Sequence, residues 1–205
     1  MKYIRYSLLD NLRGLTLISM VMYHTVWDMV YIFENDWDWF KGNQAYIWQQ
    51  SICWCFILLS GFCWSFGRKK WKRGFTVFGA GALISLVTIN VMPENRVVFG
   101  VLTLLGSSML LMIPLEKVLR KVNPYIGLVC TFFLFLYVKD ISYGHLGWKE
   151  FGYIRLPQEW YCNLFSAYWG LPADEFFSSD YFGIFPWLFL FVTGYFVFRI
   201  FERNR

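Results

Sequence analysis

Charged residues are scarce in this sequence. They make up 16% of its 205 residues, while 57% of the residues are hydrophobic and 22% are aromatic. Soluble domains average about 25% charged residues. Apolar runs long enough to cross a bilayer recur along the whole chain. The composition therefore excludes a mainly soluble protein and predicts an integral membrane protein with little left over for a separate soluble domain.

Several common catalytic and metal-binding signatures are also missing. The sequence has no Gly-rich phosphate loop, no G-x-S-x-G serine elbow and no HExxH zinc motif. Of the five cysteines, only Cys162 falls in a predicted outer loop, so a disulfide framework is not expected. Cys53 and Cys55 share a predicted helix but point to different faces, which is poor geometry for a metal. We therefore expect no metal site.

Six apolar segments have lengths suited to membrane-spanning helices, which need ~20 residues. The predicted fold is therefore all-α and polytopic, as a single domain over residues 1–205 with a long outer loop at 142–181. Asp10 and Arg13 interrupt the first segment and no small-residue cleavage site follows, so it is interpreted as a retained span and not a signal peptide. The six predicted spans cover residues 8–32, 46–66, 75–92, 97–115, 124–141 and 182–201.

Most of the Lys and Arg residues lie on one side of the predicted membrane. Cytoplasmic loops carry an excess of these residues, so this side is predicted to be cytoplasmic, together with both termini. The net charge of +5 reflects this asymmetry and requires no nucleic-acid partner. The basic segments on this side are Lys2, Arg5, residues 68–73, residues 116–121 and the tail 199–205.

The first predicted span carries four ionisable side chains. At 3.6 residues per turn, Asp10, Arg13, Leu17, His24 and Asp28 fall within roughly 60° of arc. His24 and Asp28 are one turn apart, so the carboxylate can accept a proton from the ring and fix its tautomer. Arg13 precedes His24 by about 16 Å along the helix. Ionisable groups inside a membrane are costly, and this stripe therefore indicates a functional path across it.

Simpler explanations remain open for the same residues. Asp10 and Arg13 could form a salt bridge at the helix entrance, with Arg13 reaching to water. His24 could be a hydrogen-bonding group between helices. His145, in the predicted outer loop, is expected to have a structural role. The basic run 68–73 is explained by membrane topology alone, although it could also bind lipid headgroups or the phosphates of a cytosolic ligand.

Four stretches of the sequence resemble one family of membrane acetyltransferases. The first is "RYSLLDNLRGLTLISMVMYHTVWDMVYIF" (residues 5–33), which resembles the first span of the bacterial relatives of heparan-alpha-glucosaminide N-acetyltransferase. Three later stretches fit the same family. The family's second span is similar to residues 56–74, a later Gly-containing span to residues 97–111, and its closing signature to residues 170–199. The spacing of Arg13 and His24 also resembles that of the wider superfamily of membrane O-acetyltransferases.

The resemblance implies an enzyme of the bacterial plasma membrane. Its donor would be cytosolic acetyl-CoA or another acyl-CoA, and its acceptor a sugar amine or hydroxyl of an extracytoplasmic glycan or glycolipid. His24 would act as general base or acyl carrier, oriented by Asp28. Further residues would bind the two substrates. Those implied are Arg13, Asp10, Arg68, Lys69, Lys70 and Arg73 for the donor, and Asp180 and Trp187 for the acceptor.

The outer loop offers further candidates for acceptor contacts. Segment 158–171, bounded by Pro157 and Pro172, predicts a short interfacial helix. Its aromatic rings suit the headgroup belt, and they could also stack on a sugar. Asp180 either bonds acceptor hydroxyls or caps the N-terminus of the last span.

Two positions depart from the family pattern. Thr103 stands where many relatives carry a histidine, and Gly183 where relatives usually carry proline. The first departure removes a possible second base. The chain is also short beside relatives with extra spans, so a homo-oligomer is expected. A transporter of small molecules or lipids and a non-catalytic assembly protein remain alternatives, although the sequence lacks the similar halves of many transporters.

Overall fold

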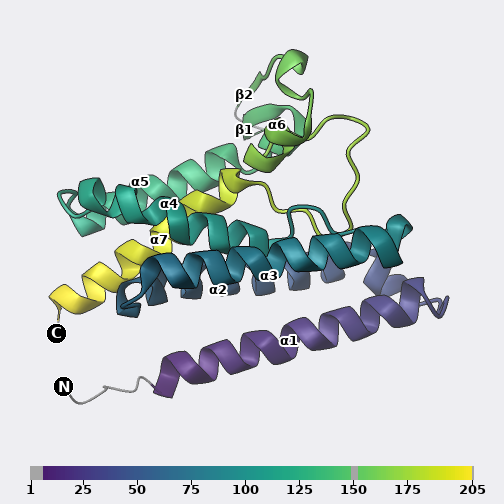
Figure 1. The fold of residues 1–205 in the computed structure, drawn as a ribbon, viewed down its shortest axis with the longest axis horizontal. Coiled ribbons are helices and arrows are strands. Elements are labelled where there is room, and N and C mark those ends of the chain that lie inside the picture. The colour runs from purple at the N-terminus through teal and green to yellow at the C-terminus, as the bar shows by residue number, and fades with distance from the viewer. Residues whose placement is uncertain (1–6, 149–151, 205) are drawn as a thin grey trace. The chain divides into compact units, whose positions relative to one another are not determined.

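A computed structural model describes residues 7–148 and 152–204 of the chain (Figure 1). The structure is 74% helix and 4% strand, which confirms the all-α class. The chain divides into two compact units, Met1–Leu59 and Ser60–Arg205. The basic residues Lys2 and Arg5, expected on the cytoplasmic side, lie outside the described residues.

Aromatic side chains hold the first unit together. Val30, Phe40 and Ala45 form its buried core. The ring of Tyr23 packs on those of Phe40 and Trp48, with centroids 5.2 and 5.3 Å apart. The Trp48 indole also donates a hydrogen bond of 2.8 Å to the hydroxyl of Ser19. The elements of this unit are α1 (Ser7–Tyr31), the short 3-10 helix η1 (Asp38–Lys41) and most of α2 (Asn43–Phe62).

The second unit is a bundle of long helices with a small hairpin and a short helix at one end (Figure 1). Its α-helices are α3 (Lys70–Val91), α4 (Val101–Leu119), α5 (Pro124–Val138), α6 (Leu164–Trp169) and α7 (Ile184–Arg203). Its 3-10 helices are η2 (Cys63–Phe66), η3 (Pro93–Asn95), η4 (Ile141–Tyr143) and η5 (Gln158–Trp160). Strands β1 (His145–Trp148) and β2 (Gly152–Arg155) pair antiparallel, with His145 opposite Arg155.

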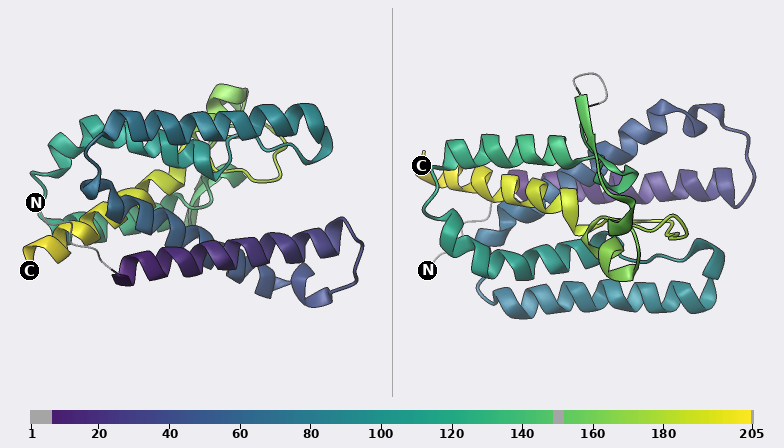
Figure 2. Two further views of the ribbon diagram at one scale, coloured as in Figure 1. Left: turned by 60° about the horizontal axis from the view of Figure 1, so that its bottom comes forward. Right: turned by 90° about the horizontal axis from the view of Figure 1, so that it is seen from above.

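Glycines let the helices of the second unit approach at backbone distance. Helices α3 and α4 lie side by side (Figures 1 and 2). A Cβ atom on Gly81 of α3 would lie 2.6 Å from the backbone nitrogen of Thr103, and one on Gly106 of α4 would lie 2.4 Å from that of Phe78. Small residues at helix contacts are typical of membrane proteins, where close packing replaces the hydrophobic effect.

Helix α7 is the most buried helix of this unit. A Cβ on Gly127 of α5 would collide with the ring of Phe196, so α5 packs closely on α7. The hydroxyls of Thr131 and Thr193 add a hydrogen bond of 2.9 Å between these two helices. At its other side, α7 presents the carbonyl of Phe191 to Gly61 at the end of α2.

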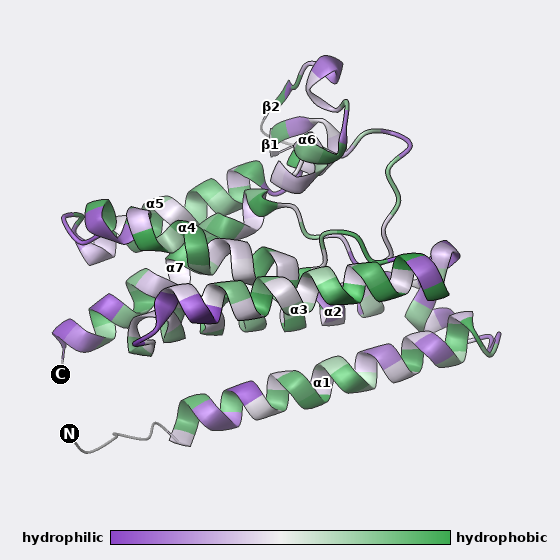
Figure 3. Cartoon of the chain, viewed as in Figure 1, coloured by the Kyte–Doolittle hydropathy of each residue, from purple (hydrophilic) through white to green (hydrophobic). Residues whose placement is uncertain are grey.

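Five helical segments of the described residues are long and apolar enough to cross a membrane. They correspond to the second to sixth predicted spans. The fourth begins at Val101 and not at residue 97, and it continues through Pro114 to Leu119. Helix α1 forms where the first span is predicted, but polar residues interrupt it, visible as purple bands in Figure 3. A membrane crossing by the first predicted span, residues 8–32, therefore stays a prediction. The five segments are Asn43–Phe66, Lys70–Val91, Val101–Leu119, Pro124–Tyr143 and Ile184–Arg203.

The loop after α5 is more structured than the sequence predicts. A continuous helix over 158–171 is wrong, because η5 ends at Trp160 and α6 begins only at Leu164. Asn163 explains the break, since its side chain caps α6 and accepts a hydrogen bond of 2.9 Å from the backbone of Ser166. The hairpin escapes prediction because each of its strands has only four residues.

Candidate functional site

The polar stripe of α1 lies outside the surface that packs within its own unit. The packing surface contains Ser19, Tyr23 and Val30, which contact η1 and α2. At 100° per residue, the stripe with His24 and Asp28 is about a third of a turn away from this surface. The first unit therefore leaves one face of α1 apolar and packed, and a separate face polar and available.

His24 and Asp28 lie one turn apart on α1, and both are exposed. The imidazole of His24 stands edge-on to the Tyr23 ring, with centroids 6.0 Å apart. Among the residues that the structure describes, no hydrogen bond joins His24 to Asp28. Side chains at this spacing are neighbours on a helix surface, so a rotamer change suffices to form one. Orientation of the ring by Asp28 therefore stays a prediction.

Arg13 and Asp10 lie about three and four turns before His24, toward the N-terminal end of α1. Arg13 is half-buried, whereas Asp10 is exposed in the first turn. A carboxylate in the first turn stabilises the positive end of the helix dipole, which is a further structural role for Asp10.

The basic run before α3 is partly tied to its own unit. The ammonium of Lys70 donates a hydrogen bond of 2.5 Å to Glu116 and lies 4.8 Å from the centre of the Trp64 ring. Arg73 donates a 3.4 Å bond to the carbonyl of Cys63. Arg68 and Lys69 are exposed. The four residues predicted to bind the donor therefore differ in their surroundings, and Lys70 lines a pocket of the second unit.

That pocket has a volume of about 480 Å³ and lies where α4 and α7 end. Glu116 binds Lys70 on one side and accepts a 2.9 Å bond from Arg120 on the other. Arg199 donates from the same guanidinium nitrogen to the carbonyls of Leu119, Arg120 and Val122, at 2.9 to 3.3 Å. The pKa of Arg120 is raised by its hydrogen bond to Glu116, so the guanidinium stays charged.

The sequence identified Lys70 of this pocket but missed its other cations. Arg120 and Arg199 belong to the basic segments 116–121 and 199–205, which are both predicted to be cytoplasmic. Their shared side of the membrane was the one sequence signal that could have grouped them with Lys70. Together with Lys70 they oppose the two carboxylates of Glu116 and Glu202 in the pocket wall. The pocket is therefore net positive, and arginine forks suit phosphate oxygens.

Asp180 and Trp187, predicted to contact the acceptor, lie at the opposite end of the second unit. The carboxylate of Asp180 is 3.5 Å from the backbone nitrogen of Val101, at the N-terminus of α4. The predicted cap of the last span is thus wrong, since Gly183 takes the N-cap position of α7 without a side-chain bond. Trp187 packs against Phe135 and Phe182, with ring centroids 5.6 and 5.1 Å apart.

Thr103, the departure from the family pattern, is buried in the contact between α3 and α4. Its Oγ1 would lie 2.6 Å from a Cβ on Gly81. A larger side chain at position 103 would therefore collide with α3. Within residues 7–148 and 152–204, no three His, Cys, Asp or Glu side chains come together in a group that could hold a metal ion.

Comparison with protein families relates nearly the whole chain to one known family. The model of the catalytic heparan-alpha-glucosaminide N-acetyltransferase family matches residues 5–205. The chain belongs to this family. Searches of the curated proteins and of the solved structures gave no match. Members of the heparan-alpha-glucosaminide N-acetyltransferase family are membrane acetyltransferases that use acetyl-CoA in general. The match includes the α1 stripe and both ends of the second unit.

Proposed function

We propose that the protein transfers an acetyl group from cytosolic acetyl-CoA to a sugar amine or hydroxyl outside the membrane. The observation that carries this proposal is the family match over residues 5–205, which includes a helix with His24 and Asp28 on a face that its own unit leaves open. The fold supplies helices long enough to cross a bilayer. The distribution of Lys and Arg predicts which end of the helices is cytoplasmic, and a charged donor would approach from that end.

The donor's phosphates bind at the cytoplasmic end. The pocket of Lys70, Arg120 and Arg199 offers them three cations, and Glu116 holds Lys70 in place. Arginine pairs with phosphate through parallel hydrogen bonds, whereas lysine acts as a compact charge. Arg13 and Asp10 on α1, the exposed Arg68 and Lys69, and the half-buried Arg73 provide further contacts along the approach.

His24 carries the chemistry as a general base. Its neutral ring nitrogen takes the proton of the acceptor amine or hydroxyl while the acceptor atom forms a bond to the thioester carbonyl carbon. The carbon–sulfur bond then breaks, and the thiolate of the donor leaves and takes up the proton. Asp28 accepts a hydrogen bond from the other ring nitrogen and stabilises the charged ring. Attack by His24 itself, through an acetyl-histidine, is the other route.

The acceptor is held at the extracytoplasmic end. Asp180 lies at this end, beside the N-terminus of α4, and its carboxylate can accept hydrogen bonds from the hydroxyls of the acetyl acceptor. Trp187 contributes an apolar wall beside Phe135 and Phe182. A homo-oligomer that completes this site from a second copy is part of the proposal.

The test compares wild-type protein with His24→Ala and with Thr25→Ala as a matched control. Thr25 is exposed on the same turn but lies outside the stripe. A general base contributes about 10²–10⁴-fold, so His24→Ala should lower acetyl-CoA turnover by at least ~100-fold without weakening acetyl-CoA binding. Thr25→Ala should retain both. Turnover by His24→Ala at the wild-type rate would refute the role of His24. No binding and no turnover by the wild type would refute the acetyltransferase itself and favour a transporter.

A further inference from the structure

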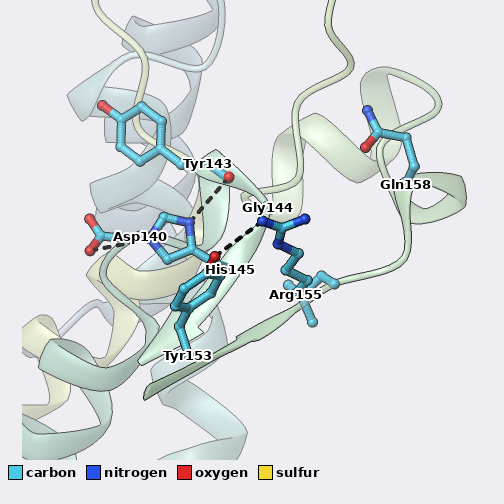
Figure 4. Close-up of a pocket in the computed structure, with 8 residues that line it drawn as sticks. Asp140, Tyr143, Gly144, His145, Tyr153, Arg155 and Gln158 are labelled. Atoms are coloured by element: carbon cyan, nitrogen blue, oxygen red, sulfur yellow. Dashed lines mark hydrogen bonds and ion pairs between the residues drawn. The ribbon is translucent and has the colours of Figure 1, made fainter. Parts of the chain in front are cut away.

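A second polar pocket lies at the opposite end of α5 from Arg199 (Figure 4). Its volume of about 580 Å³ falls within the ~300–1,000 Å³ usual for ligand sites. The 15 residues of α5 separate the two ends by about 22 Å. By the charge distribution, this end is extracytoplasmic. The side chains that define the pocket are Asp140, Tyr143, His145, Tyr153, Arg155 and Gln158.

His145 is fixed in this pocket with one ring nitrogen unused. The residue is only 8% exposed. Its Nδ1 lies 3.2 Å from the carbonyl oxygen of Tyr143, which can only accept, so Nδ1 carries the hydrogen. In the neutral ring, Nε2 is therefore an acceptor. Among the described residues, this buried Nε2 finds no hydrogen-bond partner. Such a group is costly to leave unpaired.

The carboxylate of Asp140 lies close to Nε2. Its Oδ2 is 3.9 Å away, which is beyond hydrogen-bond distance. Both atoms accept, so a ligand that supplies two donor hydrogens close together can pair with both once the His145 ring turns slightly to expose Nε2, which is buried in the present structure. An amino group or a pair of adjacent hydroxyls does this. An anion is disfavoured, because the carboxylate faces the same space.

The remaining walls of the pocket suit a ring with one apolar face. Tyr143 is 78% exposed and Tyr153 is 43% exposed, so both rings offer surface at the pocket. The guanidinium of Arg155 donates a 3.2 Å bond to the hydroxyl of Tyr153 and holds that ring in place (Figure 4). Tyrosine combines an apolar body with a polar tip, and a sugar ring presents the same two kinds of surface.

We infer that this pocket binds a sugar unit through Asp140 and Nε2 of His145, which accept two hydrogens from an amino group or adjacent hydroxyls. His145 is thus a binding residue as well as a structural one. The sugar-binding property stands on the pocket geometry alone. Recruitment of the acetyl acceptor by this pocket rests on the proposed function.

The test measures the binding of three sugars to the full chain by calorimetry. They are glucosamine, a disaccharide of glucosamine with free amino groups, and glucose. The protein is purified in a detergent without a sugar headgroup, because a glycoside detergent would compete for the pocket. Asp140→Asn removes the charged acceptor with little change of shape, and Tyr143→Ser removes the exposed ring without touching the hairpin. Glu159→Gln is the control, as an equivalent neutralisation in the same loop outside the pocket wall.

Asp140→Asn should weaken sugar binding about tenfold or more, and Tyr143→Ser should weaken it as well. Glu159→Gln should bind as the wild type does. Wild-type protein that binds none of the three sugars, or Asp140→Asn and Tyr143→Ser with wild-type affinity, would overturn the inference. Binding and turnover of acetyl-CoA by the wild type, measured on the same samples, report on the proposed function separately. The absence of both together with intact sugar binding would contradict the acetyltransferase proposal and leave the sugar site standing.

Discussion

Gly81 and Gly79 both lie inside α3, but only Gly81 faces α4. A Cβ on Gly81 would come within 2.6 Å of the backbone nitrogen and of Oγ1 of Thr103. No described atom outside the local helix lies within 4 Å of a Cβ placed on Gly79. Gly81→Ala must therefore move α3 away from α4 or displace Thr103, whereas Gly79→Ala meets open space.

The difference between these two variants isolates the steric term. Each gains the same helix propensity, about 1 kcal/mol for glycine to alanine, so this gain cancels. Overpacking typically costs ~1–3 kcal/mol. We expect Gly81→Ala to be less stable than Gly79→Ala by that amount. At ~2–4 °C per kcal/mol for a protein of this size, their melting temperatures should differ by ~2–12 °C.

Thermal unfolding of both variants in one detergent, followed by circular dichroism, provides the measurement. Adding Thr103→Ala to Gly81→Ala removes Oγ1 but leaves the backbone nitrogen at 2.6 Å, so it should restore only part of the loss. Equal stabilities of Gly81→Ala and Gly79→Ala would show that α3 and α4 do not meet at Gly81, and the account of this contact would then be wrong.

Two further predictions concern polar groups of the second unit. Glu116→Gln should lower the free energy of unfolding by ~1.5–3 kcal/mol, because it weakens two charged hydrogen bonds of a carboxylate that is 12% exposed. The control Arg120→Gln should stay within ~0.5 kcal/mol of the wild type, since Arg120 is 67% exposed. Equal losses of stability in the two variants, measured by denaturant unfolding, would contradict this prediction. Burial raises the pKa of Tyr181 above its usual ~10, so its contribution to stability is complete below pH ~10 and is lost as the pH rises further. Ultraviolet titration should show a late-ionising tyrosine that is missing in Tyr181→Phe, and identical titrations would refute this.

The long helices follow from the sequence because lipid leaves few alternatives. An apolar run of ~20 residues must satisfy its own backbone hydrogen bonds, and the helix does so locally. Helix α3 and helix α7 accordingly begin within a few residues of their predicted positions. The start of α4 was misplaced because Val97–Gly100 is as apolar as the helix that follows. In this segment Phe99 adopts a φ of +56°, which is not helical, so α4 begins only after it.

The pockets could not be predicted in the same way, because each depends on which helix ends meet. Lys70 and Glu116 are 46 residues apart, and nothing in either segment identifies the other as its partner. Asp140 and His145 are close in sequence, but the pocket also needs Arg155, which reaches it through the register of the hairpin. By contrast, His24 and Asp28 share one helix, so their spacing alone brings them together.

Thr103 connects the packing of the second unit with the chemistry of the first. The resemblance described above implies a histidine at this position in many relatives, where it would be a possible second base. Here, the close approach of Gly81 leaves no space for an imidazole, so restoring a histidine would require α3 to shift. A local substitution therefore cannot replace a lost base on α1. The proposed mechanism therefore assigns proton transfer to His24 without a second base at position 103, and we expect His24→Ala to show no residual turnover from that position.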